Sequence, residues 1–178
     1  MPPTIETSRL FLRELEIIDL TAVFNYSSEP EYARFLPYPT VTSIEDFKSI
    51  FQDILSTEDS YLWAICLMVD RQLIGTIELS LESPTKASLH YEIERQFWQK
   101  GFATEATQAV IAWTWENLSQ IAQINADTHS ANLGSQRVME KSGMNRIKTE
   151  IETWDKFPEP VKVLYYQIDR PIVRVVDR

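Results

Sequence analysis

The chain has 178 residues, a length typical of one domain at ~150 residues per domain. Hydrophobic residues make up 44% of the sequence and aromatic residues 11%, enough for a core without disulfides or a metal, so the composition excludes disorder as the main state. Acidic residues outnumber basic ones by 26 to 17, and the formal net charge of −9 excludes a surface built to bind nucleic acid through its phosphates.

The cysteine count and the hydropathy pattern predict where the protein resides. Cys66 is the one cysteine, so the chain forms no internal disulfide, which fits a reducing cytosol. The first residues lack the basic and apolar regions of a signal peptide, and no run approaches the ~18 consecutive apolar residues of a membrane span. We therefore expect a soluble, cytoplasmic protein without a membrane partner.

The first elements in chain order are a short strand and two helices. Apolar spacing predicts the strand over residues 6–13 and a helix over 17–26, followed by a polar, proline-marked stretch. Ser43 and Asp46 have the spacing of a capping box, and apolar residues then recur at helical spacing, which predicts the second helix over 44–56.

Three strands joined by short turns are predicted next. Residues 61–69 are apolar on both alternating sets, as in a strand covered on both faces, so we assign Cys66 to the core rather than to a nucleophile. In residues 73–82 and 87–94, apolar and polar side chains alternate, which predicts half-buried strands. The short turns make these three strands an antiparallel meander.

The last part of the chain alternates helices and strands. The changes of apolar period predict helices over residues 102–118 and 132–142, and strands over 121–128, 144–154 and 161–168. Gly143 follows the second of these helices, where a glycine takes the left-handed conformation that ends helices. Neither a repeat nor a low-complexity linker divides the chain, so we expect residues 1–178 to form a single domain.

The turn between the meander and the following helix is the strongest indication of chemistry. Gly101 and Ala103 are small residues that leave backbone N–H groups uncovered where the helix begins. Such N–H groups, together with the positive end of the helix dipole, bind anions. The sequence therefore predicts an anion site in this turn.

Three segments resemble motifs of the GNAT superfamily of acetyl-CoA-dependent N-acetyltransferases. They are Glu6-Thr7-Ser8-Arg9-Leu10-Phe11-Leu12-Arg13, Trp98-x-Lys100-Gly101-Phe102-Ala103-Thr104-Glu105-Ala106 and Asn132-x-x-Ser135-x-Arg137-Val138-Met139-Glu140-Lys141-Ser142-Gly143-Met144. They are most similar to the branch that contains the ribosomal-protein serine and alanine N-terminal acetyltransferases. The resemblance spans roughly residues 5–169 and implies an α+β fold, with a central mixed, mostly antiparallel twisted sheet of about six to seven strands flanked by helices.

The resemblance also implies acetyl-CoA as cosubstrate, and no metal. The residues that it places at the coenzyme are Ile93, Gln99, Lys100, Gly101, Phe102, Ala103, Thr104, Asn132, Ser135 and Lys141. Two of them have a second interpretation: Asn132 is also a candidate N-cap, and Lys141 also offsets the negative end of its helix. The resemblance further implies that the strand holding Tyr91–Ile93 parts from the one holding Ile124–Asp127, and that a free backbone N–H near Ile93 stabilises the oxyanion of the tetrahedral intermediate.

Two proton positions follow from the chemistry of amine acetylation. Many members carry a tyrosine that protonates the leaving thiolate, but this chain has Met139 at that position, which cannot donate a proton. By resemblance, Ser135 is the catalytic proton donor instead. The alternative interpretation of Ser135 is a serine in the first turn of a helix that bonds local backbone. A base must take the proton of the amine at neutral pH. Glu92 is the leading candidate, with a solvated surface glutamate as its alternative, and His129 is the rival base.

We therefore expect an enzyme that moves an acetyl group from acetyl-CoA to a primary amine, with a protein N-terminal amine of the ribosomal-protein type as the leading acceptor. The alternatives are a polyamine or aminoglycoside acceptor, or a coenzyme A-binding module without catalysis. The segment 25–58 is expected to shape the acceptor pocket, where its tyrosines and phenylalanines line the pocket or fill the core. The expected oligomeric state is a monomer or a homodimer.

Overall fold

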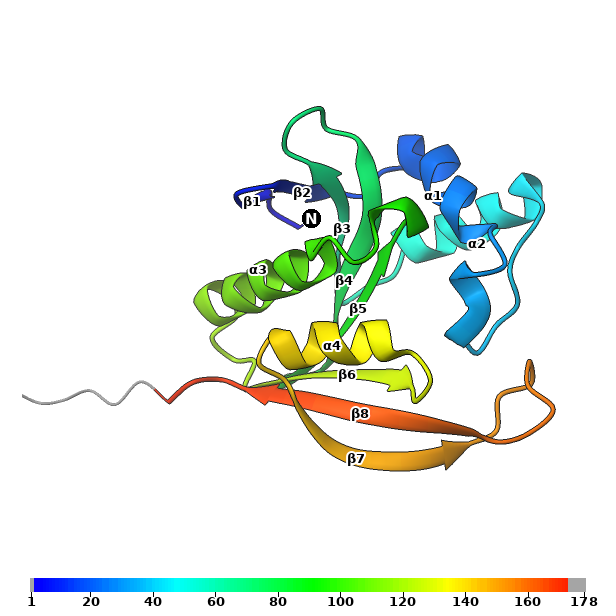
Figure 1. Cartoon of the computed structure of the whole chain (residues 1–178). Helices are drawn as coiled ribbons and strands as arrows, with labels where there is room; N and C mark the ends of the chain where they lie inside the picture. Colours follow the sequence, from blue (N-terminus) through cyan, green and yellow to red (C-terminus); the bar gives the residue numbers. More distant parts are fainter. Residues whose placement is uncertain (1, 173–178) are drawn as a thin grey trace, which may run out of the picture.

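A computed structural model describes residues 2–172. Figure 1 shows one twisted sheet with helices packed on both faces. The strands are β1 (Ile5–Glu6), β2 (Leu10–Glu14), β3 (Ser60–Leu67), β4 (Leu73–Ser83), β5 (Lys86–Ile93), β6 (Gln123–His129), β7 (Asn145–Glu152) and β8 (Val161–Asp169). The α-helices are α1 (Leu20–Ser27), α2 (Ile44–Leu55), α3 (Phe102–Asn117) and α4 (Leu133–Lys141), and the short 3₁₀-helices are η1 (Ile17–Asp19), η2 (Tyr32–Phe35) and η3 (Arg95–Phe97).

The expected α+β fold is confirmed, and the sheet has eight strands in the order β1-β2-β3-β4-β5-β6-β8-β7. Strands β3, β4 and β5 form the predicted antiparallel meander, while β5 and β6 run parallel, so the sheet is mixed and mostly antiparallel. One reason for the larger strand number is that the predicted strand over 6–13 is divided into β1 and β2. The chain turns between them, where Thr7 N bonds the Leu10 carbonyl oxygen at 2.9 Å.

Local signals place the helix ends well. Ser43 Oγ accepts a hydrogen bond from Asp46 N at 3.3 Å, so α2 begins at the predicted cap. Gly143 has a φ of +87° and follows α4, as expected for a glycine that ends a helix. The predicted helix over 17–26 begins as the 3₁₀-helix η1 and becomes α1 only from Leu20.

Two apolar layers lie on opposite faces of the sheet. Helices α3 and α4 cover one face, where Trp63, Ile65 and Val110 belong to the larger buried cluster. Helices α1 and α2 cover β2, β3 and β4 on the other face, where Phe51 and Cys66 are buried. Because successive strand residues point to opposite faces, β3 contributes to both layers, as its doubly apolar sequence predicted. Cys66 is fully buried, which confirms its place in the core.

The β5 and β6 strands separate after a short parallel contact. Lys86, Ala87 and Ser88 pair with residues 123–125, and no further pair joins these two strands within residues 2–172. The remaining part of β5 therefore runs away from β6, as Figure 1 shows. This confirms the expected parting of the two strands and leaves an opening in the sheet, with α4 beside β6.

Candidate active site at the opening between β5 and β6

Residues 99–104, which we call the anion loop, lie where the chain leaves β5 and enters α3. Gly101 immediately precedes the helix in the left-handed region, with a φ of +82°, and the first bond of the helix runs from Glu105 N to the Gly101 carbonyl oxygen at 3.0 Å. The N–H groups of residues 102–104 therefore have no acceptor within the helix. A positive φ suits glycine, and it turns these groups toward one place. The loop fits an anionic ligand such as a pyrophosphate.

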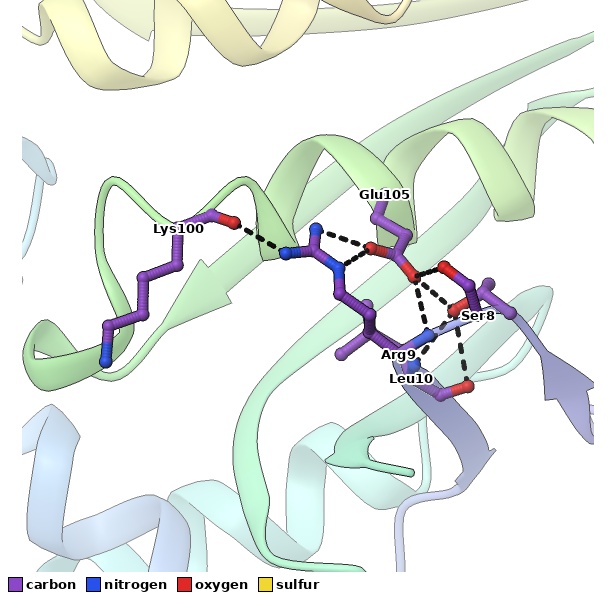
Figure 2. Close-up of polar contacts among 6 residues, drawn as sticks. Ser8, Arg9, Leu10, Lys100 and Glu105 are labelled. Carbon is purple, nitrogen blue, oxygen red and sulfur yellow. Dashed lines mark hydrogen bonds and ion pairs between the residues drawn. The ribbon is translucent and has the colours of Figure 1, made fainter. Parts of the chain in front are cut away.

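A clamp from the first segment of the chain holds this loop, as Figure 2 shows. The Arg9 guanidinium bonds the Glu105 carboxylate through Nε at 2.6 Å and the Lys100 carbonyl oxygen through Nη1 at 2.9 Å. Thr7 Oγ1 and the Arg9 backbone N–H donate to the other Glu105 oxygen at 2.6 and 3.0 Å. Two of the three resembling segments thus meet in one network across the break between β1 and β2.

The clamp also sets the charge state of its carboxylate. Partial burial raises the pKa of Glu105, but the hydrogen bonds from Thr7 and Arg9 outweigh it and hold this pKa below its ordinary value. The sequence alone indicates no function for Arg9 or Glu105, although both residues lie within the segments that resemble GNAT motifs. Neither residue type nor spacing indicates that they meet, because 96 residues separate them.

The end of β5 points backbone groups into the opening. Glu94 N bonds the Ile74 carbonyl oxygen on β4 at 2.8 Å, so by alternation the N–H and carbonyl of Ile93 point away from β4, toward the opening. The Trp98 indole N–H donates to that Ile93 carbonyl at 2.6 Å and leaves the Ile93 N–H on the same side. Gly75 allows β4 to approach the backbone of β5 closely, because a Cβ at Gly75 would lie 2.1 Å from the Glu92 carbonyl oxygen.

Glu92 lies under the segment that follows α1 rather than on an open sheet face. Tyr32 donates its phenolic proton to Glu92 Oε1 in a short hydrogen bond, and Thr76 Oγ1 lies 3.5 Å from Oε2. Burial raises the pKa of this carboxyl, and the bonds from Tyr32 and Thr76 oppose the rise. The alternative of a solvated surface glutamate is therefore wrong.

A small hollow lies at the same end of β5. Its walls are Tyr26, Glu29, Tyr32, Ile93, Glu94, Arg95 and Trp98. The expected aromatic residues of the segment 25–58 divide between the two roles: Tyr26 is buried in the core behind the hollow, Tyr32 reaches Glu92, and Tyr38 is 49% exposed.

His129 lies on the opposite arm of the opening, at the end of β6. Its ring centroid lies 5.5 to 5.9 Å from those of Phe35, Trp154 and Phe157, and we call these four residues the aromatic cluster. His129 Nδ1 accepts a hydrogen bond from the Ala131 N–H at 3.0 Å, and burial lowers the pKa of the imidazole. Because Nδ1 accepts this bond, the proton of the neutral imidazole lies on Nε2, and neither nitrogen has a free lone pair for the proton of an amine.

The first turn of α4 brings Ser135 to β5. Asn132 Oδ1 accepts a hydrogen bond from Ser135 N at 3.1 Å, which confirms Asn132 as the N-cap. Ser135 Oγ lies 2.8 Å from the Tyr91 hydroxyl, so this side chain faces β5 rather than bonding only local backbone. The alternation along β5 places Tyr91 on the packed face, but it does not predict that the Tyr91 hydroxyl contacts α4.

Two further residues of the third segment, Met139 and Lys141, differ in their exposure to solvent. Met139 is fully buried in the larger cluster. Lys141 is exposed in the last turn of α4, and its carbonyl oxygen accepts a hydrogen bond from Gln108 of α3 at 2.8 Å. Both interpretations of Lys141, an anion contact and an offset of the helix dipole, are compatible with this position.

Residues 2–172 contain neither a candidate metal site nor a candidate membrane-spanning helix. In this part of the chain, no group of three or more His, Cys, Asp or Glu side chains is arranged to hold a metal ion. The helices of the described residues include none with the length and apolar character that crossing a membrane requires.

Comparisons with known proteins agree with this geometry. The family model of the acetyltransferase (GNAT) domain matches residues 9–145, which is more than half of the chain. YoaA, an uncharacterised N-acetyltransferase of Bacillus subtilis (strain 168), is 29% identical over 151 residues, which cover 82% of this chain and 85% of that protein. YnaD of the same strain, also an uncharacterised N-acetyltransferase, is 28% identical over 161 residues, covering 86% and 93%.

Solved structures share the fold at low identity. A GNAT-family acetyltransferase from Bacillus anthracis has a TM-score of 0.84 at 24% identity, covering 94% of this chain and 99% of that chain. Spermidine N-acetyltransferase from Vibrio cholerae with coenzyme A and spermine has a TM-score of 0.80 at 17% identity, covering 92% and 97%. The ribosomal L7/L12 α-N-protein acetyltransferase RimL with coenzyme A has a TM-score of 0.80 at 16% identity, covering 94% and 98%. The domain match, together with the curated relatives, shows that this chain belongs to the GNAT acetyltransferase family and is an acetyl-CoA-dependent N-acetyltransferase.

Proposed function

We propose that residues 1–178 act as one N-acetyltransferase domain that acetylates a protein N-terminal amine in the opening between β5 and β6. The main support for this proposal is that several functional groups lie together at the end of β5 that has separated from β6. This end holds the Glu92 carboxylate and the inward-pointing Ile93 N–H, it leads into the anion loop at Gly101, and it contacts Ser135 of α4. Groups for binding, proton removal and charge stabilisation thus converge on one place.

The coenzyme-binding role rests on the loop and on α4. Residues 99–104 would hold the pyrophosphate through the N–H groups that have no acceptor within α3. Asn132 and Ser135, beside the opening, would contact the pantetheine arm, and Lys141 the adenosine phosphates. Bound acetyl-CoA supplies the acetyl thioester that the amine attacks.

Glu92 acts as the base in this proposal. An alkylammonium is not a nucleophile, so a base beside the amine must accept its proton, and the Glu92 carboxylate can do so. Burial raises the pKa of Glu92 toward that of the amine, which improves the match for this transfer. The Ile93 N–H stabilises the oxyanion that forms on the thioester carbonyl, because it points into the opening.

A protein N-terminus is the proposed acceptor because three motifs resemble the ribosomal-protein branch. The similarity in fold does not decide this point, since a spermidine N-acetyltransferase and an N-terminal acetyltransferase superpose equally well, each with a TM-score of 0.80. One observation favours a polyamine instead: Glu29 and Glu94 line the hollow beside Glu92 and would attract an acceptor with several ammonium groups.

An acceptor screen tests the proposal. The protein would be given acetyl-CoA with peptides that begin with serine or alanine, the same peptides with a blocked N-terminus, spermidine, spermine and an aminoglycoside. We expect coenzyme A release and a mass increase of one acetyl group only with the free N-termini. A kcat/KM at least tenfold higher for spermidine than for any peptide would assign the polyamine class instead. Release no faster than thioester hydrolysis with every acceptor would refute both classes.

A further inference from the structure

The contact between Tyr91 and Ser135 spans the opening on the face that carries α3 and α4. Tyr91 lies on the part of β5 that has left β6, and its hydroxyl lies 2.8 Å from Ser135 Oγ and 3.1 Å from the Ser135 carbonyl oxygen. The Ser135 N–H is already bonded to Asn132 Oδ1. Both atoms of the serine that face β5 therefore contact one tyrosine hydroxyl.

A count of protons gives two arrangements for this contact. A tyrosine hydroxyl has one proton to donate, and a serine hydroxyl likewise has one. If Tyr91 donates to the Ser135 carbonyl, the Ser135 proton bonds back to Tyr91 and is unavailable to a ligand. If Tyr91 donates to Ser135 Oγ, the serine proton is free to point into the opening. The contact with Oγ is the shorter one, at 2.8 Å against 3.1 Å to the carbonyl oxygen, and this favours the second arrangement. That arrangement presents a donor, strengthened by the bond that Oγ itself accepts.

Acid strengths decide what that donor can do for a leaving thiolate. A free thiol has a pKa near ~8.5 and a tyrosine near ~10. Burial raises the pKa of Tyr91 further, although its bond with Ser135 opposes the rise. Neither hydroxyl therefore yields its proton readily to a thiolate of ordinary basicity. A hydrogen bond donated to sulfur as its charge develops costs no such transfer and is charge-assisted.

We propose that Tyr91 and Ser135 form a relay that stabilises the leaving thiolate by hydrogen bonding, with Tyr91 as a positioning residue that turns the Ser135 proton toward the sulfur. This inference rests on the proposed function and on the place that the family resemblance gives the coenzyme sulfur. It assigns Ser135 as a hydrogen-bond donor rather than an acid that loses its proton.

The atoms and electrons balance without a net proton transfer from the relay. The amine nitrogen forms a bond to the acetyl carbon, the carbon–sulfur bond breaks, and its electron pair stays on sulfur. Glu92 takes the proton that converts the ammonium to a neutral amine and passes it to solvent. After the attack, the nitrogen loses a second proton to solvent as the amide forms. The thiolate takes a proton from solvent after the reaction, and both hydroxyls remain neutral throughout.

The relay is tested first by binding, without turnover. The thiolate of bound coenzyme A absorbs in the ultraviolet, so its pKa can be titrated on the wild type, Ser135→Ala, Ser135→Thr and Tyr91→Phe. We expect the thiol pKa of coenzyme A bound to the wild type to lie below that of free coenzyme A, and to rise by about one unit in Ser135→Ala, as loss of a donor to a charged group requires. The rise should be smaller in Tyr91→Phe, and Ser135→Thr, which keeps a hydroxyl, should restore most of the wild-type pKa.

Kinetics with a confirmed acceptor separate a relay from a merely structural contact. Ser135→Ala should lower kcat about tenfold while KM for acetyl-CoA changes less than threefold. Because Tyr91 acts through Ser135, adding Tyr91→Phe to Ser135→Ala should cause no further loss. Tyr61→Phe is the matched control, since this tyrosine of β3 packs on Trp63 and Trp113.

Each contrary result has a distinct meaning. An unchanged thiol pKa in Ser135→Ala overturns the relay, even if Tyr91→Phe fails to fold. A further tenfold loss in the double variant shows that Tyr91 acts independently of Ser135 and also overturns it. Failure of the wild type to bind coenzyme A would instead contradict the proposed coenzyme site.

Discussion

The anion loop is built differently from the proposed acceptor side of the opening, by which we mean Glu92, Tyr32 and the aromatic cluster. The loop depends on backbone conformation within one short stretch, with Gly101 in the left-handed region, and on a single clamp from Arg9. The acceptor side depends on side chains from distant segments, as where Tyr32 bonds Glu92 and where the aromatic cluster joins η2, β6 and the loop before β8. Backbone geometry is thus encoded locally, whereas the acceptor side forms only when the chain folds.

The largest effect is expected in the loop, from Gly101→Val. A β-branched residue at a φ of +82° is strained, so the loop would change conformation and its N–H groups would no longer converge. Binding of acetyl-CoA, expected in the micromolar range for the wild type, should fall below detection in calorimetry. Circular dichroism should show that the helices and strands persist.

Asparagine supplies the matched control at the same position. Gly101→Asn also adds a side chain, and its Cβ would lie 3.4 Å from the flexible end of Arg9, but asparagine tolerates the left-handed region better. This variant should keep measurable binding. Equal affinity of Gly101→Val and wild type would place the coenzyme site elsewhere.

On the acceptor side, Glu92→Gln should lower kcat/KM by about 10²–10⁴-fold, because the amide cannot take the proton of the amine. The loss should shrink as pH rises and more of the amine is already neutral. The comparison variant is His129→Ala, which removes the rival base from the aromatic cluster and should retain most of the activity.

The pH–rate profiles of the two variants decide the assignment of the base. A loss below about threefold in Glu92→Gln is too small for general-base catalysis. If His129→Ala loses far more under the same conditions, His129 is the base.

Variants of Arg9 distinguish whether this residue supports coenzyme binding by its charge or by positioning the anion loop. Arg9→Ala should weaken coenzyme binding about tenfold, since it removes the hydrogen bonds that Arg9 donates to Glu105 and to the Lys100 carbonyl oxygen of the loop. Arg9→Lys keeps the charge but loses the forked geometry, so it should rescue little.

Glu105→Gln supplies the deciding measurement for that clamp. If Arg9 acts only by attracting phosphate, removal of the opposing carboxylate should tighten binding of the coenzyme. If Arg9 positions the loop, Glu105→Gln should weaken binding in calorimetry, because the bonds from Thr7 and Arg9 lose their charged acceptor. We expect the second result.

The extent to which the sequence predicts this molecule follows from the range of each interaction. Ser43, Gly101 and Gly143 act on residues within one turn of themselves, so their roles can be deduced from neighbours in the sequence. Alternation likewise places Tyr91 on the packed face of β5. It does not predict the partner of its hydroxyl, because periodicity defines a face and not the helix that covers it.

Long-range hydrogen bonds account for the features that sequence reasoning missed. The break between β1 and β2 occurs where Thr7 and Arg9 bond Glu105, and no local pattern predicts this tertiary contact. Glu92 illustrates the same limit, since strict alternation made it a polar residue on an exposed face. Only the packing of Tyr32 over it makes it a half-buried carboxylate.

The smallest expected effect is on stability, and it has opposite signs in the two regions. The pKa of Glu92 is raised in the folded protein, so its contribution to stability is present below its unfolded pKa of ~4.3 and is lost as pH rises through the folded value. The pKa of Glu105 is lowered, so its contribution is present above ~4.3 and is lost as pH falls through the folded value.

Thermal unfolding of the two glutamine variants therefore tests this contrast. At pH 7, Glu92→Gln should keep the wild-type Tm or raise it by a few degrees, because a carboxylate that burial disfavours is removed. Glu105→Gln should lower the Tm by a few degrees at pH 7, because the clamp loses its charge. The difference for Glu92→Gln should shrink as pH falls toward ~4.3, whereas the difference for Glu105→Gln should shrink only as pH falls below ~4.3. A lower Tm for Glu92→Gln at pH 7 would mean that the bond from Tyr32 outweighs burial, and that this carboxylate stabilises the fold instead of opposing it.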